Sequence, residues 1–157
     1  MDFRIIELPS FEAVSSGVDK DVDSSSNGKL GKLDTYFSKI KPNSKDSFMP
    51  RDFLYWDKEN NGMVWMWALT PDMDDGGFEH IHFEGGYYLT YHYRDQDEKT
   101  NGKLYKEALE FIKNSDVFEL DERPNHYGMG HIITPALVIK KQGFAIMETF
   151  IPVKLNK

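Results

Sequence analysis

The sequence contains no cysteine among its 157 residues. This absence excludes a disulfide framework, a thiol nucleophile and a thiolate metal site. The sequence also lacks any apolar run close to the ~20 residues that cross a bilayer, so we expect no membrane partner. The first residues, Met1 to Pro9, have neither the basic start nor the apolar segment of a secretory signal. We therefore expect a cytoplasmic protein.

Acidic residues outnumber basic ones, 26 to 19, and the formal net charge is −7. A surface of this sign repels phosphate backbones, and no cluster of Lys or Arg stands out along the chain. We therefore expect no direct binding to nucleic acid. A cationic ligand is compatible with this balance of charge.

Motifs for phosphate binding and for serine-based hydrolysis are absent too. The glycine pairs Gly76-Gly77 and Gly85-Gly86 match no phosphate-binding loop, and Gly-x-Ser-x-Gly does not occur. The segment His80-Ile-His82-Phe-Glu84 has a spacing that metal ligands use, but no third histidine is clearly placed beside it. We interpret it as a solvated face of a sheet and expect neither a metal site nor a cofactor.

The length suits one domain with a real core, and hydrophobic periodicity predicts an alternation of strands and helices. Strands are expected at 3–8, 11–17, 63–70, 78–83, 87–93, 116–122 and 144–153, the last interrupted by Pro152, with a short apolar segment at 53–56. Amphipathic helices are expected at 29–40, ending before Pro42, and at 103–114, with loops at 19–28 and 46–51. Residues 123–142 follow no clear pattern.

The order of these elements repeats. Trp67-Ala-Leu-Thr-Pro71 closes the first half of the chain and Glu148-Thr-Phe-Ile-Pro152 closes the second. We interpret this as an internal duplication, with repeats of about 1–75 and 76–157 in one domain. The expected fold class is α+β, built from two βαββ repeats.

Aromatic residues are unusually frequent, at 14% of the chain. They concentrate at 53–56, 65–67 and 87–93, and tyrosines in such number suit the wall of a semi-polar cavity. We take Trp65, Trp67, Tyr88, Tyr91 and Tyr127 as candidate walls, with core packing as the alternative. Tyr91 and Tyr88 point to opposite faces of the strand 87–93, so only one of these faces lines a cavity.

Glu148 is the candidate centre of the site. Alternation along the last strand places it among Phe144, Ile146, Phe150 and Pro152. A buried carboxylate without a partner is costly, which favours a functional role such as pairing with a cationic ligand. The alternatives are an edge-facing Glu and a Glu held by tyrosine hydroxyls for stability. Phe150 joins the predicted ligand-binding residues.

Four features together resemble the GyrI-like small-molecule-binding family, the effector-binding domain attached to many AraC-type and MerR-type transcription regulators. They are the opening Arg4–Phe11, the turn Gly86-Tyr87-Tyr88 into a strand, the second helix after it and the closing Glu148–Val153. The resemblance implies a curved antiparallel sheet with both helices on its outer side and a ligand groove between the repeats. It implies that Glu148 meets cationic drugs among aromatic residues, and that Trp67 takes the pseudo-symmetric place.

Two segments depart from the family pattern, at His92–Asp95 and at His126–His131, where Tyr127 would substitute for the usual residues. The ligand identity therefore stays open. We expect a stand-alone sensor or sequestering protein, since no helix-turn-helix precedes residue 3. The alternatives are a hydrolase with Glu148 as general base and Tyr127 or Tyr88 as hydrogen-bond donor, and a protein-binding inhibitor of the gyrase-inhibitor type. A protein partner, and the choice between monomer and homodimer, stay open.

Overall fold

The computed structural model describes residues 3–40 and 52–157 and divides the chain into two compact units. One is continuous, Ser10–Glu84; the other is discontinuous and joins Met1–Pro9 to Gly85–Lys157. Nine strands and three helices lie in the described residues, which confirms the α+β class. The predicted end of the first helix at Pro42 and the predicted loop 46–51 lie outside the described residues.

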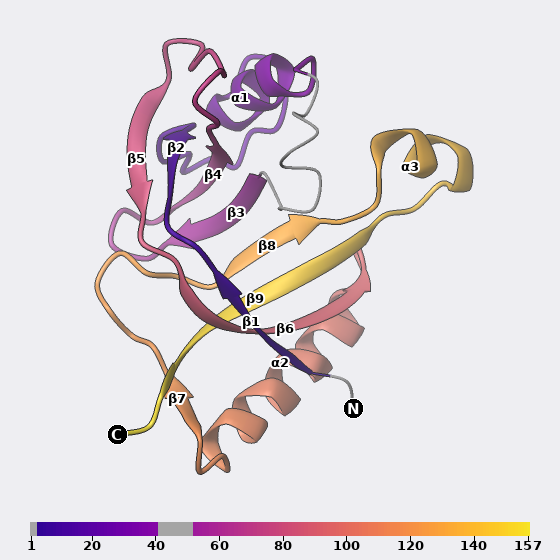
Figure 1. Cartoon of the computed structure of the whole chain (residues 1–157). Helices are drawn as coiled ribbons and strands as arrows, with labels where there is room; N and C mark the ends of the chain where they lie inside the picture. Colours follow the sequence, from indigo (N-terminus) through magenta and orange to yellow (C-terminus); the bar gives the residue numbers. More distant parts are fainter. Residues whose placement is uncertain (1–2, 41–51) are drawn as a thin grey trace. The chain divides into compact units, whose positions relative to one another are not determined.

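The continuous unit holds four strands, which pair only in antiparallel fashion, and one helix (Figure 1). Its elements are β2 (Phe11–Ser15), α1 (Lys29–Phe37), β3 (Asp52–Asp57), β4 (Gly62–Ala68) and β5 (Glu79–Phe83). The strand order is β3-β4-β2-β5. Val14 of β2 packs against Leu33 and Phe37 of α1, and these three side chains are fully buried. The apolar face predicted for this helix is thus the face that packs against the sheet.

The discontinuous unit holds five strands, again antiparallel, and two helices. Its elements are β1 (Arg4–Leu8), β6 (Gly86–Arg94), α2 (Glu98–Lys113), β7 (Phe118–Leu120), β8 (Met129–Ile132), α3 (Ala136–Gln142) and β9 (Ile146–Leu155). The strand order is β1-β6-β9-β8, and β7 also pairs with β9. β9 therefore has partners along both edges.

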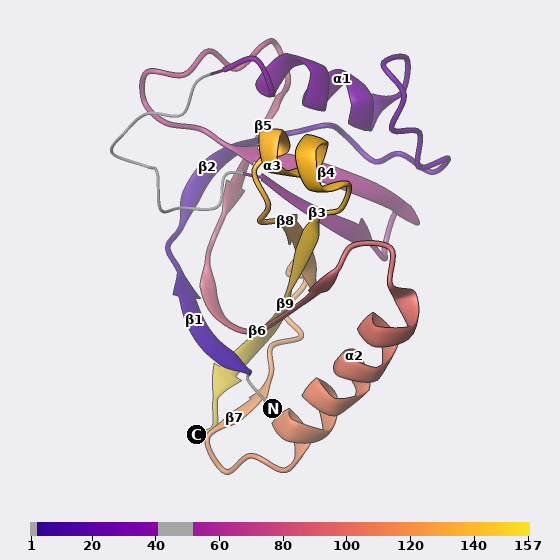
Figure 2. The same ribbon diagram turned by 90° about the vertical axis from the view of Figure 1, so that its right-hand side faces the viewer.

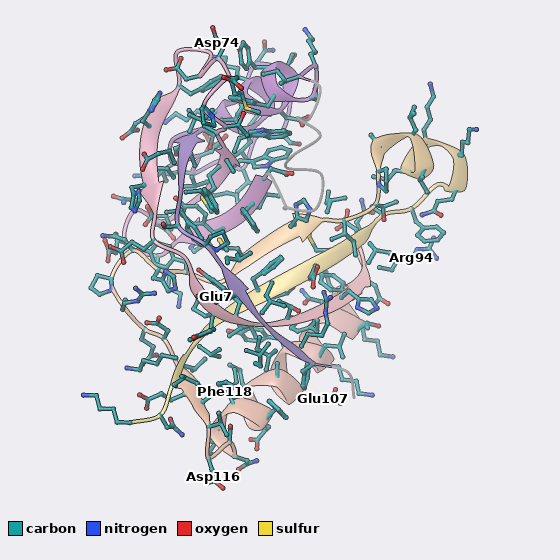
Figure 3. All side chains as sticks on the ribbon, in the orientation of Figure 1. Glu7, Asp74, Arg94, Glu107, Asp116 and Phe118 are labelled. Atoms are coloured by element: carbon teal, nitrogen blue, oxygen red, sulfur yellow. The ribbon has the colours of Figure 1, made fainter. Side chains whose placement is uncertain are left out.

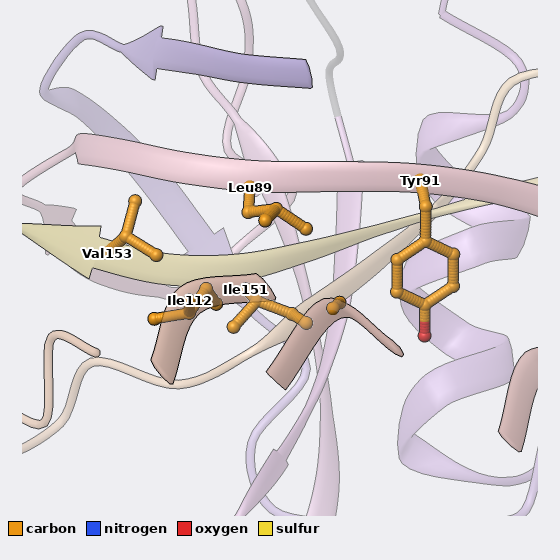
Figure 4. Packing of buried hydrophobic residues seen from close by; sticks show 6 residues of the cluster. Leu89, Tyr91, Ile112, Ile151 and Val153 are labelled. Carbon is orange, nitrogen blue, oxygen red and sulfur yellow. The ribbon is translucent and has the colours of Figure 1, made fainter. Parts of the chain in front are cut away.

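Helix α2 covers one face of the sheet of the discontinuous unit (Figure 2). Leu89 of β6 and Ile151 and Val153 of β9 pack against Ala108 and Ile112 of the helix, and all five side chains are buried (Figure 4). This cluster is the hydrophobic core of the unit.

Helix α2 begins at Glu98, five residues before the start that the sequence pattern predicted. The Asp97 side chain accepts a hydrogen bond from the backbone N–H of Thr100 at 3.1 Å and so caps the first turn. The polar first turn carries no apolar periodicity, and for this reason the pattern did not reveal it.

The last strand and the segment before it differ from expectation. β9 continues through Pro152, whereas the sequence predicted an interruption there. The missing N–H of the proline is tolerated, while its carbonyl oxygen accepts from the backbone N–H of Asp121 at 3.0 Å. Helix α3 lies in the stretch that followed no pattern, and none of its residues is buried. It joins β8 to β9 and is a third helix, where two were expected.

The two compact units do not coincide with the predicted repeats, because β1 pairs with β6 of the second half. In a matching way β5, which precedes β6, pairs with β2 of the first half. Each unit thus borrows an edge strand from the other half of the sequence. The duplication itself stays a prediction. Among residues 3–40 and 52–157, no helix has the length and apolar character needed to span a membrane.

Replacing Leu89 by Ala tests the core of the discontinuous unit. Leu89 is fully buried, and removing such a side chain leaves a cavity, so the free energy of unfolding should fall by about 2–5 kcal/mol. The matched control is Leu137→Ala on α3, because Leu137 is 77% exposed. Urea denaturation should give the control a midpoint close to that of the wild type; an equal loss in both variants would contradict the assigned core.

Candidate functional site

The sheet of the discontinuous unit has a second face, on the side opposite α2. Side chains alternate along a strand, so the residues next to Leu89 and Ile151 in sequence point away from the helix. We call this second face the distal face. It carries Arg4, Ile6 and Leu8 of β1, Tyr88, Thr90 and His92 of β6, Met129 and His131 of β8, and Glu148, Phe150 and Pro152 of β9. The register therefore gathers Glu148, Tyr88 and Phe150 on one face.

Glu148 is buried, with 7% of its surface exposed. Its Oε1 atom accepts a hydrogen bond from Nη2 of Arg4, and the two groups form an ion pair. In register, Glu148 lies opposite His92 on β6 and opposite His131 on β8. Within residues 3–40 and 52–157, no three His, Cys, Asp or Glu side chains are grouped so that they could hold a metal ion.

Arg4 is a site residue that the sequence pattern did not single out. Along β9 the alternation predicts a carboxylate among apolar neighbours, and this holds for Phe150 and Pro152. The guanidinium comes from β1, two strands away and 144 residues distant in sequence. The only sequence signal was the place of Arg4 in the opening motif, which did not indicate its partner.

Tyr88 lies fully buried on the distal face. Its ring contacts Phe150 edge-on, with centroids 6.3 Å apart, and its hydroxyl lies 3.3 Å from Nε2 of His126. Burial raises the pKa of the Tyr88 phenol well above its ordinary value, an effect that the positive charge of Arg123 reduces and the negative charge of Asp121 increases. The hydroxyl is therefore a protonated hydrogen-bond donor at neutral pH.

A charged cluster next to Tyr88 also escaped the sequence analysis. Nε of Arg123 donates to both carboxylate oxygens of Asp121 at 3.1 and 3.0 Å, and its Nη2 lies 3.1 Å from Nε2 of His126. The side chains of Asp121 and His126 are 6% and 7% exposed. The cluster ties the segment 121–126 to the residue before β6, because Nη2 of Arg123 also donates to the carbonyl oxygen of Gly85 at 3.3 Å.

Gly86 makes room for this cluster. Its backbone has φ +138°, and a Cβ atom at this position would lie 3.3 Å from Nη2 of Arg123. A larger residue would press on the guanidinium and strain the backbone. The Gly86-Tyr87-Tyr88 motif thus contains both the glycine that leaves space for Arg123 and the tyrosine, Tyr88, that lies next to the charged cluster. The segment 123–142 gave no readable pattern, which is why Arg123 and His126 were missed.

The remaining predicted walls lie elsewhere. Tyr91 packs in the cluster against α2, and its hydroxyl donates to Oδ1 of Asn101 at 2.8 Å. In the continuous unit, Trp67 stacks on Phe37 of α1 with centroids 5.2 Å apart, and Nε1 of Trp65 donates to Oδ2 of Asp52 at 2.9 Å. These three rings pack against helices of their own units.

Tyr127 and the two histidines of β5 lie outside these two helix-packed clusters. Tyr127 is partly buried and directly follows His126 in the sequence. The side chains of His80 and His82 are 54% and 57% exposed. Nε2 of His80 lies 2.6 Å from Oδ2 of Asp75, and Nδ1 of His82 lies 2.5 Å from Oε1 of Glu12. They form a solvated face of the sheet, as the sequence indicated.

The raised pKa of Tyr88 generates a prediction for alkaline pH. The folded state favours the neutral phenol, so its contribution to stability is fully present below the unfolded pKa of about 10 and is lost as pH rises toward the folded pKa. Between these limits the free energy of unfolding of the wild type should fall with pH more steeply than that of Tyr88→Phe, by up to ~1.4 kcal/mol per pH unit. Urea denaturation at several pH values measures both slopes, and identical slopes would contradict the prediction.

No protein-family model matches the chain, and no curated protein matches it in sequence. Solved structures do resemble it. SAV2435 bound to tetraphenylphosphonium has a TM-score of 0.58 at 14% identity, over 98% of this chain and 94% of that one. The EcmrR C-terminal domain has a TM-score of 0.63 at 15% identity, over 98% and 97%.

A hydrolase from Listeria innocua is also similar, with a TM-score of 0.58 at 12% identity, over 97% of this chain and 91% of that one. Identities this low establish the fold and nothing finer. The chain has the fold of the GyrI-like effector-binding domains, the fold that the resemblance of its sequence implied.

Proposed function

We propose that the chain binds a small hydrophobic organic cation on the distal face, with Glu148 as the opposing charge. The observation that carries this proposal is the burial of the Glu148 carboxylate on the same face as Tyr88 and Phe150. A buried carboxylate is stable only with a positive partner or a proton. Arg4 is that partner from the exposed side, and a ligand that brings both a positive charge and apolar surface can take its place and contact the aromatic rings as well.

The chemistry of the neighbouring side chains supports this ligand class. Aromatic faces attract cations by about 0.5–2 kcal/mol each, and more when water is excluded. Phe150 and Tyr88 are both fully buried on the distal face, and Tyr127 follows in sequence His126, whose Nε2 lies 3.3 Å from the Tyr88 hydroxyl. We therefore propose Glu148, Tyr88, Phe150 and Tyr127 as the ligand-binding residues. Trp65, Trp67 and Tyr91 are the other predicted ligand-binding residues, and their rings pack against helices.

The comparisons support the same class. Tetraphenylphosphonium, bound in SAV2435, is a permanent cation whose phosphorus carries four phenyl groups. The fold likeness to the EcmrR C-terminal domain fits a sensing role. We propose that this chain acts as a sensor of such molecules or sequesters them.

Tetraphenylphosphonium is the probe for the decisive test. Calorimetric titration of the wild type should give saturable binding, and Glu148→Gln should weaken it about tenfold or more, which corresponds to ~1.4 kcal/mol. The Gln side chain keeps the size and removes the charge. The neutral probe triphenylphosphine oxide should bind both proteins with the same affinity, since it does not use the charge of Glu148.

Glu7→Gln is the matched control. Glu7 lies on β1 (Figure 3), is exposed and alternates to the face of α2 rather than the distal face. The variant changes the net charge by the same amount as Glu148→Gln and should bind tetraphenylphosphonium like the wild type. Equal affinities in Glu148→Gln and Glu7→Gln would refute the role proposed for Glu148.

A hydrolase is the second candidate, favoured by the likeness to the Listeria innocua hydrolase and by the protonated hydroxyl of Tyr88. Glu148 would act as general base for water, and Tyr88 or Tyr127 would donate to the developing negative charge. Arg4 engages one carboxylate oxygen of Glu148, which leaves Oε2 for the water. Release of p-nitrophenolate from p-nitrophenyl acetate, abolished by Glu148→Gln but not by Glu7→Gln, would favour this function over binding alone.

A further inference from the structure

The chain itself supplies a counter-charge for Glu148. Nη2 of Arg4 donates to Oε1 of Glu148, so the buried carboxylate is already neutralised. Arg4 lies opposite Thr90 in register and Glu148 lies opposite His92, so the ion pair spans β6 diagonally. A ligand cation that approaches Glu148 meets the position that the guanidinium holds.

The two partners of this ion pair differ in how firmly they are held. The side chain of Glu148 is 9% exposed and belongs to β9, which has paired strands along both edges. The side chain of Arg4 is 64% exposed and belongs to β1, at the edge of the sheet of the discontinuous unit. Its one hydrogen bond to the part of the chain that the structure describes is the bond to Glu148. Arg4 can therefore move into water, whereas Glu148 cannot.

We infer that Arg4 is a displaceable counter-cation that competes with the ligand for Glu148 and so sets which cations bind. This inference rests on the proposed function and deepens it. Any cation must gain enough from burial of its own apolar surface to replace a guanidinium that is already in place. Small hydrophilic cations lack this surface and stay in water. Hydrophobic cations bring it and replace Arg4.

Removal of the competing charge should strengthen binding. Arg4→Gln should bind tetraphenylphosphonium about threefold to tenfold more tightly than the wild type, the factor expected when an ion pair of one exposed and one buried group no longer has to be broken. Arg4→Lys keeps the competing charge and should bind like the wild type. Arg4→Gln should bind the neutral triphenylphosphine oxide no more tightly than the wild type, because a neutral ligand does not compete with Arg4 for Glu148.

Lys106→Gln is the control for a lost positive charge, because Lys106 is exposed on α2, on the opposite side of the sheet. It should bind the cation like the wild type. Arg4→Met, which keeps much of the apolar stem, replaces Arg4→Gln if that variant is unfolded by circular dichroism. A gain confined to Arg4→Gln and Arg4→Met would support the inference.

The contrary outcomes are distinct. If Arg4→Gln binds tetraphenylphosphonium with wild-type affinity or more weakly, while Glu148→Gln loses affinity, Arg4 does not compete and the inference fails with the proposed function intact. If neither the wild type nor Arg4→Gln binds the cation, the proposed function fails, and the inference with it. Binding by Arg4→Gln alone would be the strongest support, because competition would then hide the site in the wild type.

Discussion

The alternation of side chains along β9 is the constraint on which the rest of the discontinuous unit depends. One set of side chains, represented by Ile151 and Val153, packs against α2 and builds the core. The other set, Glu148 and Phe150, can only point to the distal face. Because β9 pairs along both edges, a shift by one residue would put a carboxylate into the core and break the pairing with three strands. Stability therefore fixes the place of Glu148.

The electrostatics of the distal face follow from this placement. A carboxylate held by the register of a central strand has to be satisfied where it stands, and Arg4 reaches it from β1, on the far side of β6. The second charged cluster, around Asp121 and His126, is likewise satisfied within itself and holds Tyr88 at its edge. Both clusters combine buried acidic groups with an arginine that is partly exposed.

The sequence predicted what depends on local periodicity. The alternation of Glu148 and Phe150, and the two longer helices, could be read from the order of apolar residues, and the resemblance added the fold. Helix α3 could not be read, because Ala136–Gln142 buries no face and so carries no amphipathic signal. Pro152 suggested a break that the ladder of β9 did not require.

The pairing between Arg4 and Glu148 could not be predicted for a different reason. It depends on which strands become neighbours, and neither residue type nor spacing records that β1 pairs with β6 rather than with β2. The same holds for Trp65 and Trp67, whose position on β4 was predicted but whose packing against α1 was not. The partners of a side chain across a sheet are set by topology, which local patterns do not contain.

The edge strand β1 also has a consequence for folding during translation. Residues 10–84 contain every strand of the continuous unit, so these contacts can form while the second half is still being synthesised. β1 is translated before the other strands of its unit, yet its partner β6 follows some eighty residues later, and Glu148, the partner of Arg4, is 144 residues away in sequence. β1 therefore pairs only after β6 has been synthesised, and closing so long a loop slows folding. During that interval the Arg4 side chain and the backbone of β1 are available to chaperones.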